Sequence, residues 1–109
     1  MPGDSRLSIG DKGMIRISVM YPKGGEFNFD YYVNKHMAMV HKRLDSFGLV
    51  KSEVDKGLAD SPYAAVGYLV FKNMEDMQKG LQAHDPEFAA DLVNYYTIKP
   101  QFQVSEIVG

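Results

Sequence analysis

The sequence contains no cysteine and no tryptophan among its 109 residues. Without cysteine the chain can form no disulfide, no iron–sulfur cluster and no thiolate zinc site, and it has no thiol nucleophile. An excess of positive charge is also missing, because 12 Lys and Arg side chains are set against 14 Asp and Glu, for a formal net charge of -2. With no basic patch, neither nucleic acid nor an anionic membrane is an expected partner.

The chain also lacks a long apolar run. No stretch approaches the roughly 20 apolar residues that a membrane-spanning helix needs. The polar start, MPGDSRLSIGDKG, has no apolar segment of the kind found in secretory signals. We therefore expect a cytoplasmic protein, and we interpret residues 1–13 as a flexible lead-in or short clasp before a single domain at 14–109.

Alternating apolar residues and helical spacing predict an α+β fold. Period-two runs predict strands at 14–21, 49–57, 63–72 and 101–108. Helices are expected at 30–47 and after Asn73, and Asp85–Pro86 predicts the start of a third, short helix. The order β-α-β-β-α-β is the ferredoxin-like plan, a four-stranded antiparallel sheet with helices on one face.

The strand at 63–72 predicts a homodimer. Its alternate residues are apolar on both faces, whereas helices cover only one face of such a sheet. An uncovered apolar face is rare in monomers, and a two-fold partner sheet would bury it. The alternative is a monomer in which the N-terminal arm covers that face.

His36 is the most informative single residue. It lies in the apolar stripe of the helix at 30–47, where a neutral imidazole would point at the sheet or into a cavity and act as an acid, a base or an orienting group. The stripe comprises Phe29, Val33, His36, Val40, Leu44 and Phe47. The alternative is a core histidine bonded to a backbone carbonyl or a tyrosine hydroxyl.

Tyrosines and one arginine complete the candidate site. Tyr32 lies one helical turn before His36. The 7 tyrosines suggest an amphipathic pocket, although packing alone explains many such residues. Arg43 could clamp an anionic group, or it could pair with a carboxylate at the surface. The expected substrate-binding residues are Tyr68, Tyr95, Tyr96, Arg43 and Val40.

Neither a metal nor a cofactor is expected. His36 and His41 are five residues apart, which places them on different faces of a helix. Gly24–Gly25 begins no phosphate-binding or dinucleotide fingerprint, and no serine lies in a G-x-S-x-G motif.

Three stretches resemble the EthD family, named for a component of an ether-degradation system. They are MIRISVMYP (14–22), FDYYVNKHMAMV (29–40) and DLVNYYTIKPQFQVSEI (91–107). The family commonly has a proline two residues after the histidine, where this chain has Ala38, so any kink made by that proline should be absent. The resemblance implies a dimeric α+β barrel with a ligand pocket between sheet and helices. It also implies that His36 is catalytic, with Tyr32 as its catalytic neighbour.

The resemblance and the residues together suggest a cofactor-free enzyme. It would act on a small apolar molecule, aromatic or ether-derived, in catabolism or tailoring, with an activity like that of an oxidoreductase or an isomerase. The rival hypothesis is a non-catalytic binding or accessory protein for an oxygenase system. A third is a dimeric scaffold in which His36 is structural.

Overall fold

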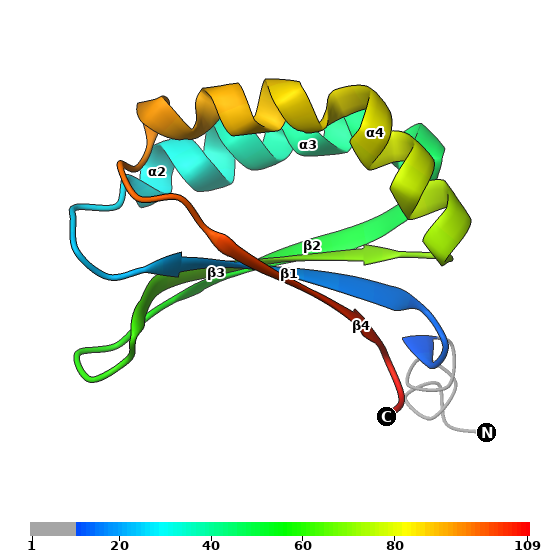
Figure 1. Ribbon diagram of the computed structural model, residues 1–109, viewed down its shortest axis with the longest axis horizontal. Helices are drawn as coiled ribbons and strands as arrows, with labels where there is room; N and C mark the ends of the chain where they lie inside the picture. Colours follow the sequence, from blue (N-terminus) through cyan, green and yellow to red (C-terminus); the bar gives the residue numbers. More distant parts are fainter. Residues whose placement is uncertain (1–10) are drawn as a thin grey trace.

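A four-stranded antiparallel sheet with helices on one face makes up the described part of the chain, residues 11–109 of a computed structural model (Figure 1). The strands are β1 (Ile15–Pro22), β2 (Leu49–Lys56), β3 (Tyr63–Phe71) and β4 (Gln101–Glu106). Their order across the sheet is β2-β3-β1-β4, so β1 and β3 are central. This arrangement confirms the predicted α+β, ferredoxin-like fold.

The first helix is continuous and contains three kinds of turn. It consists of α2 (Phe29–Tyr31), the π-helical turn η1 (Tyr32–His36), α3 (Met37–Leu44) and the 3-10 turn η2 (Asp45–Phe47). Asn28 caps its start, accepting a hydrogen bond from the Tyr31 amide at 3.0 Å. Gly48 ends it with φ +80°, the left-handed conformation that glycine adopts without a steric penalty. Both ends agree with the predicted helix.

The π turn corrects the predicted apolar stripe. A regular helix at 100° per residue places Val33 in line with His36, yet Val33 is 47% exposed and Tyr32 is 2% exposed. The reason is that the amide of Met37 bonds to the carbonyl of Tyr32, five residues back, which widens this turn and rotates the residues before His36. The chain thus has no proline at this place and still departs from a regular helix.

The second helix is α4 (Met74–Ala90), which Asn73 caps, as predicted. The predicted break at Asp85–Pro86 was wrong, because Pro86 lies inside the continuous helix and the 3-10 turn η3 (Asp91–Asn94) follows it. Proline disfavours a helix interior. Here Met77 and Phe88, both buried on the same helix, anchor it to the core on either side of the proline.

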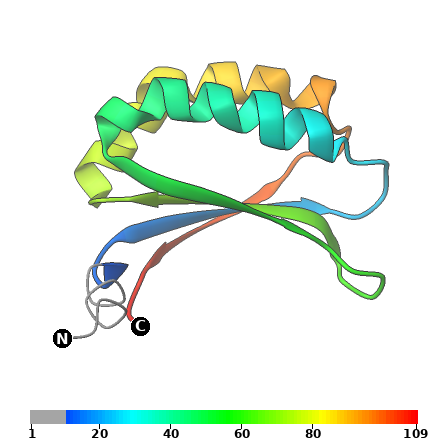
Figure 2. The same ribbon diagram turned by 180° about the vertical axis from the view of Figure 1, so that it is seen from behind.

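The two faces of the sheet differ in what covers them. Helices α2, α3 and α4 lie over the face that carries Ile17, Val19 and Leu69. None of these three helices lies on the other face, which is called the helix-free face below (Figures 1 and 2). This helix-free face has apolar side chains along β3, whereas the neighbouring strands supply mostly polar ones. The residues on this face include Val66, Tyr68 and Val70 of β3, Arg16, Ser18 and Met20 of β1, Glu53 and Asp55 of β2, and Gln103 and Ser105 of β4. The apolar part of this face is therefore a strip along β3, narrower than the apolar face that the sequence of β3 predicted.

Of the predicted lead-in, residues 1–10 lie outside the described residues. Asp11 pairs with Lys51 of β2 at 2.8 Å, and the amide of Gly13 donates to the carbonyl of Ile107 at 2.8 Å. These contacts hold residues 11–13 against the sheet. Within residues 11–109, no helix is both long enough and apolar enough to cross a membrane.

Candidate functional site

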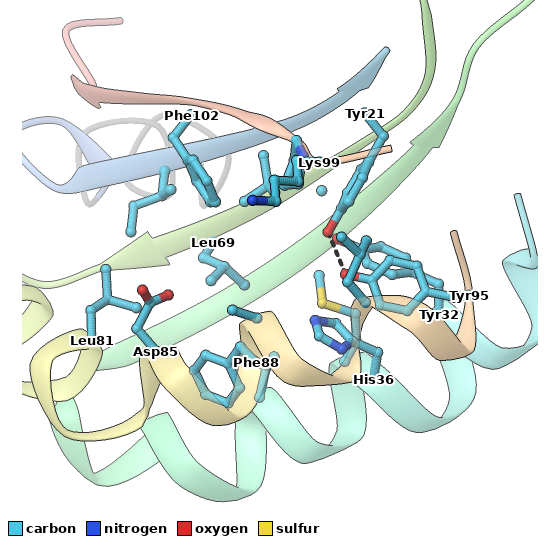
Figure 3. Close-up of a pocket in the computed structure, with 18 of the residues that line it drawn as sticks. Tyr21, Tyr32, His36, Leu69, Leu81, Asp85, Phe88, Tyr95, Lys99 and Phe102 are labelled. Atoms are coloured by element: carbon cyan, nitrogen blue, oxygen red, sulfur yellow. Dashed lines mark hydrogen bonds between the residues drawn. The ribbon is translucent and has the colours of Figure 1, made fainter. Parts of the chain in front are cut away.

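A cavity of about 790 Å³ lies between the helices and the sheet (Figure 3). Its walls are mostly apolar side chains from β1, β3, β4, α3 and α4, among them Ile17, Leu69 and Phe88. Phe102 and Val104 of the edge strand β4 line it and are 63% and 48% exposed, so the cavity opens to solvent beside β4. Its polar lining consists of Tyr21, Tyr32, His36, Gln82, Asp85, Tyr95 and Lys99. Its size and lining are typical of a small-molecule site.

His36 is held by a carboxylate that the sequence analysis did not foresee. Nδ1 of His36 lies 2.8 Å from Oδ2 of Asp91, at the start of η3 and 55 residues away along the chain. The imidazole is 5% exposed. An ionised carboxylate can only accept hydrogen bonds, so Nδ1 of His36 carries the hydrogen in this bond. In a neutral ring, Nε2 therefore has a free lone pair.

Asp91 is itself fixed by two neighbouring side chains. Its Oδ1 accepts hydrogen bonds from the Tyr31 hydroxyl at 2.8 Å and from Nδ2 of Asn94 at 2.9 Å. Burial raises the pKa of Asp91, but the hydrogen bonds from His36, Asn94 and Tyr31 outweigh it and hold the pKa below its ordinary value. Asp91 is therefore an ionised and oriented partner for His36 at neutral pH.

Nε2 of His36 faces the cavity. It has no hydrogen-bond partner among residues 11–109, and no side-chain nitrogen or oxygen in that range is both fully buried and unpartnered. Because His36 lines the cavity, Nε2 must be open to it. Burial lowers the pKa of His36, with the hydrogen bond and charge of Asp91 opposing the shift. The ring is thus mainly neutral at pH 7, with a lone pair directed into the cavity.

Three tyrosines from separate elements gather at the His36 end of the cavity. The Tyr32 ring stacks on the imidazole, with centroids 5.2 Å apart and planes at 12°. The Tyr95 ring approaches it to 4.7 Å. Tyr21, at the end of β1, shares a hydrogen bond of 2.8 Å with the Tyr95 hydroxyl (dashed in Figure 3). Burial raises the pKa of Tyr21 and Tyr95 above the ordinary value, and that of Tyr32 to about 12. All three are protonated hydroxyls in the working pH range.

Gly67 of β3 makes room for Tyr32. A Cβ at this position would lie far inside van der Waals contact of the Tyr32 hydroxyl oxygen and 3.3 Å from Cζ. Only glycine therefore lets the Tyr32 hydroxyl approach β3 this closely while the ring stacks on His36.

The structure brings together four of the seven residues that the sequence suggested. His36, Tyr32, Tyr95 and Val40 all line the cavity. Tyr68, Tyr96 and Arg43 do not line it.

The other three residues lie elsewhere, for local reasons. Tyr68 alternates with Gly67 and Leu69 and so lies on the helix-free face, with Arg16 over its ring. Tyr96 is buried, and its hydroxyl donates to the carbonyl of Pro22 at 2.6 Å. Arg43 pairs with Glu87 through two hydrogen bonds of 2.9 and 3.0 Å at the surface.

Sequence reasoning missed Asp91, Tyr31 and Tyr21 as parts of the site. All three lie within the stretches that resemble the EthD family, Tyr21 in the first, Tyr31 in the second and Asp91 in the third. Membership of these stretches was therefore the available signal. Pairing with a residue 55 or 74 positions away has no periodicity that a sequence pattern could reveal.

The other histidines lie outside the cavity lining. His41 bridges Asp45 and Ser52, at 2.9 and 2.7 Å, and so ties α3 to β2. His84 lies on α4, 4.0 Å from Glu87. In the range 11–109, no three His, Cys, Asp or Glu side chains gather as a metal site would require.

Solved structures with this fold include a close match in sequence. An EthD-like protein from Ralstonia eutropha JMP134 is 33% identical, with a TM-score of 0.82 over 90% of this chain and 95% of that one. An EthD family protein from Bacillus halodurans C-125 is 16% identical, with a TM-score of 0.66 over 85% of this chain and 97% of that one. SnoaB, a cofactor-independent oxygenase from Streptomyces nogalater, is 11% identical, with a TM-score of 0.58 over 84% of this chain and 89% of that one.

Two further structures with this fold, from Bacteroides fragilis and an uncultured marine organism, are of dimeric proteins. Identities below 25% show the shared fold alone. No protein-family model and no curated protein matches the sequence. The identity and coverage of the Ralstonia eutropha match are decisive, and the chain belongs to the EthD family.

Proposed function

We propose that this protein is a cofactor-free enzyme that moves a proton on a small, mostly apolar molecule, aromatic or ether-derived, bound in the cavity. One observation carries the proposal: a neutral histidine, held by a buried hydrogen bond to Asp91, directs Nε2 into an apolar cavity of about 790 Å³. An oriented base beside an oriented carboxylate is the arrangement that general acid–base catalysis requires.

Each group has a definable role. Nε2 of His36 accepts a proton from the bound molecule and returns one later in the cycle. Asp91 holds the ring in the tautomer with hydrogen on Nδ1 and stabilises the imidazolium that forms. Tyr32 packs flat against the ring and keeps it in place. The apolar walls limit water around the base, which strengthens its interaction with the substrate.

Family membership and fold support a small-molecule role. The chain belongs to the EthD family, and its fold is also that of the cofactor-independent oxygenase SnoaB. A reaction without a cofactor has to draw its activation from side chains, and in this cavity His36 with Asp91 is the pair suited to supply it.

The test uses a probe that reports a base in an apolar cavity without knowledge of the natural substrate. 5-Nitrobenzisoxazole opens to a coloured nitrophenolate when a base removes its ring proton. We expect wild type to accelerate this elimination and His36→Gln to lose about 10²–10⁴-fold of that rate, the usual contribution of a positioned base. His41→Gln, which changes a histidine outside the cavity, is the matched control and should retain the rate.

Asp91→Asn gives a second readout that mere destabilisation would not produce. Asp91 raises the pKa of His36 against the effect of burial. Without this carboxylate, the elimination rate should fall. The pH at which the rate is lost on acidification should also move to a lower value, because the pKa of His36 is lower. A wild-type rate equal to that of His36→Gln would refute the role of His36 as a base.

A second candidate function is non-catalytic binding of an apolar molecule, as in an accessory protein that sequesters a reaction intermediate. The size and mostly apolar lining of the cavity favour it. Native mass spectrometry of protein purified from cells would reveal a retained ligand. Retention that is unchanged by His36→Gln, together with an absence of base catalysis, would favour this candidate.

We also propose that two copies pair through the helix-free face of the sheet. Met20, Val66 and Tyr68 form a partly exposed strip there, and polar side chains beside it can bond across an interface. Dimeric proteins with the same fold support the proposal. A monomeric mass by light scattering would contradict it.

A further inference from the structure

A pair of tyrosine hydroxyls faces the same cavity as the base. Tyr21 and Tyr95 both line the cavity, and their hydroxyl oxygens lie 2.8 Å apart (Figure 3). Their side chains are 2% and 4% exposed, so bulk water reaches them only through the cavity. The backbone holds them firmly, since Tyr21 belongs to the central strand β1 and the Tyr95 amide bonds to the carbonyl of Leu92.

Counting hydrogens shows that this pair has a donor to spare. Two hydroxyls carry two hydrogens, and the bond between them uses one. If the nearby Tyr32 hydroxyl joins the chain, three hydroxyls form two bonds and again leave one hydrogen. No carbonyl or carboxylate of the described residues accepts from Tyr21 or Tyr95. The remaining hydrogen is therefore available to an acceptor atom in the cavity.

The chemical state of the pair suits an oxygen that gains negative charge. Burial raises the pKa of both hydroxyls, so they stay protonated and act as donors. A hydrogen bond between two hydroxyls polarises the outer one and strengthens the bond that it donates. Such bonds to an ionised acceptor are stronger than those to a neutral one.

The base and the donors lie at one end of the cavity. The His36 and Tyr95 ring centroids are 4.7 Å apart, and those of Tyr21 and Tyr95 are 5.7 Å apart. A small molecule can therefore reach Nε2 of His36 with one atom and the hydroxyl pair with a neighbouring oxygen.

We propose that the Tyr21–Tyr95 hydroxyl pair is an oxyanion-binding site, and that the substrate is a carbonyl compound with an acidic C–H beside the carbonyl. This inference rests on the proposed role of His36. Nε2 takes the proton from carbon, the C–H electrons form a C=C bond, and the carbonyl π electrons move to oxygen. The resulting enolate oxygen accepts a hydrogen bond from the pair. Transfer of the proton from Nε2 to the enolate oxygen gives the enol, which completes a keto–enol isomerisation and restores the free base.

Phenols test the site without turnover, because a phenolate resembles an enolate in charge and shape. 4-Nitrophenol changes its absorbance on ionisation, so its pKa can be titrated while it is bound. We expect wild type to bind the phenolate in preference to the phenol and thus to lower the pKa of the bound molecule. 4-Nitroanisole, which has no acidic hydrogen, measures the apolar contribution of the cavity.

The variants are chosen to separate donor loss from damage to the fold. Tyr21→Phe and Tyr95→Phe each leave one hydroxyl and should weaken phenolate binding in part. The double variant should lose about tenfold or more, the scale of a hydrogen bond to a charged group, with 4-nitroanisole binding unchanged. Tyr96→Phe is the control, since its hydroxyl is bound to the Pro22 carbonyl and does not line the cavity.

The outcomes separate this inference from the proposed function. Loss of phenolate preference in the double variant, with 4-nitroanisole still bound, supports the oxyanion site. Equal phenolate preference in wild type and double variant overturns it, whatever the rate of 5-nitrobenzisoxazole opening. Absence of phenolate preference in wild type also overturns it, and base catalysis by His36 could still stand.

Discussion

Replacing Gly67 by alanine should damage the site through a single atom. The new Cβ would overlap the Tyr32 hydroxyl oxygen and lie 3.3 Å from Cζ. Tyr32 is 2% exposed and stacked on His36, so its ring can move away from the new Cβ only by giving up this stack. Overpacking of this kind costs about 1–3 kcal/mol. Alanine in an extended strand would otherwise be favoured over glycine by roughly 0.5–1 kcal/mol.

Removing the hydroxyl should remove most of that cost. In a Tyr32→Phe background, the closest remaining ring atoms would be Cζ at 3.3 Å and Cε2 at 3.5 Å, a contact that a small shift relieves. The free energy of unfolding, from urea titrations of the four proteins in the cycle, should therefore show a coupling of about 1–3 kcal/mol between the two changes. The elimination rate of 5-nitrobenzisoxazole should fall in Gly67→Ala and recover in the double variant, because the stack on His36 is restored.

Gly80→Ala is the matched control. Its Cβ would meet Cβ of Phe47 at 2.8 Å, in the helix layer and away from Tyr32. It should destabilise the protein equally in both backgrounds. If Gly67→Ala also cost the same with and without the Tyr32 hydroxyl, within about 0.5 kcal/mol, the proposed clash would be refuted.

Two further predictions concern pH and assembly. Because burial lowers the pKa of His36 in the folded protein, the unfolded chain binds a proton more readily, and stability should fall as pH drops below about 6.5 toward the folded pKa. Urea midpoints between pH 7 and 5 should decline less in His36→Gln, and equal declines would exclude His36 as the source. Val66→Glu, which places a charge on the helix-free face, should convert a dimer to a monomer by light scattering. Val93→Glu, at a side chain 83% exposed on η3, should leave the mass unchanged, and a Val66→Glu dimer would argue against pairing through this face.

Local patterns predicted most of the fold. Alternation in β1 and β3 identified both central strands, and Asn28, Gly48 and Asn73 marked helix ends correctly because capping depends on near neighbours. Asp85–Pro86 misled for the same reason. It has the local form of a helix start, but the buried Met77 and Phe88 hold α4 continuous through it.

The candidate site was only partly predictable. His36, Tyr32, Tyr95 and Val40 were expected in a pocket, and they line the cavity. Tyr68 was wrongly expected in the pocket because it was chosen for its residue type. The alternation of side chains along β3 places it on the helix-free face. The contact between the Asp91 carboxylate and His36 depends on how η3 packs against the first helix. Residue spacing in the sequence does not reveal this tertiary contact.

The π turn at Tyr32–His36 makes the site dependent on chain register. A wide turn of this kind holds one residue more than a regular helix would in the same rise. Because the turn absorbs that residue, the residues before it keep the face that a regular helix one residue shorter would give them. Forcing this same sequence into a regular helix, with nothing deleted, would instead rotate the residues before His36 by up to about 100°. Tyr31 would then turn away from Asp91, although every side chain of the site would still be present in the sequence.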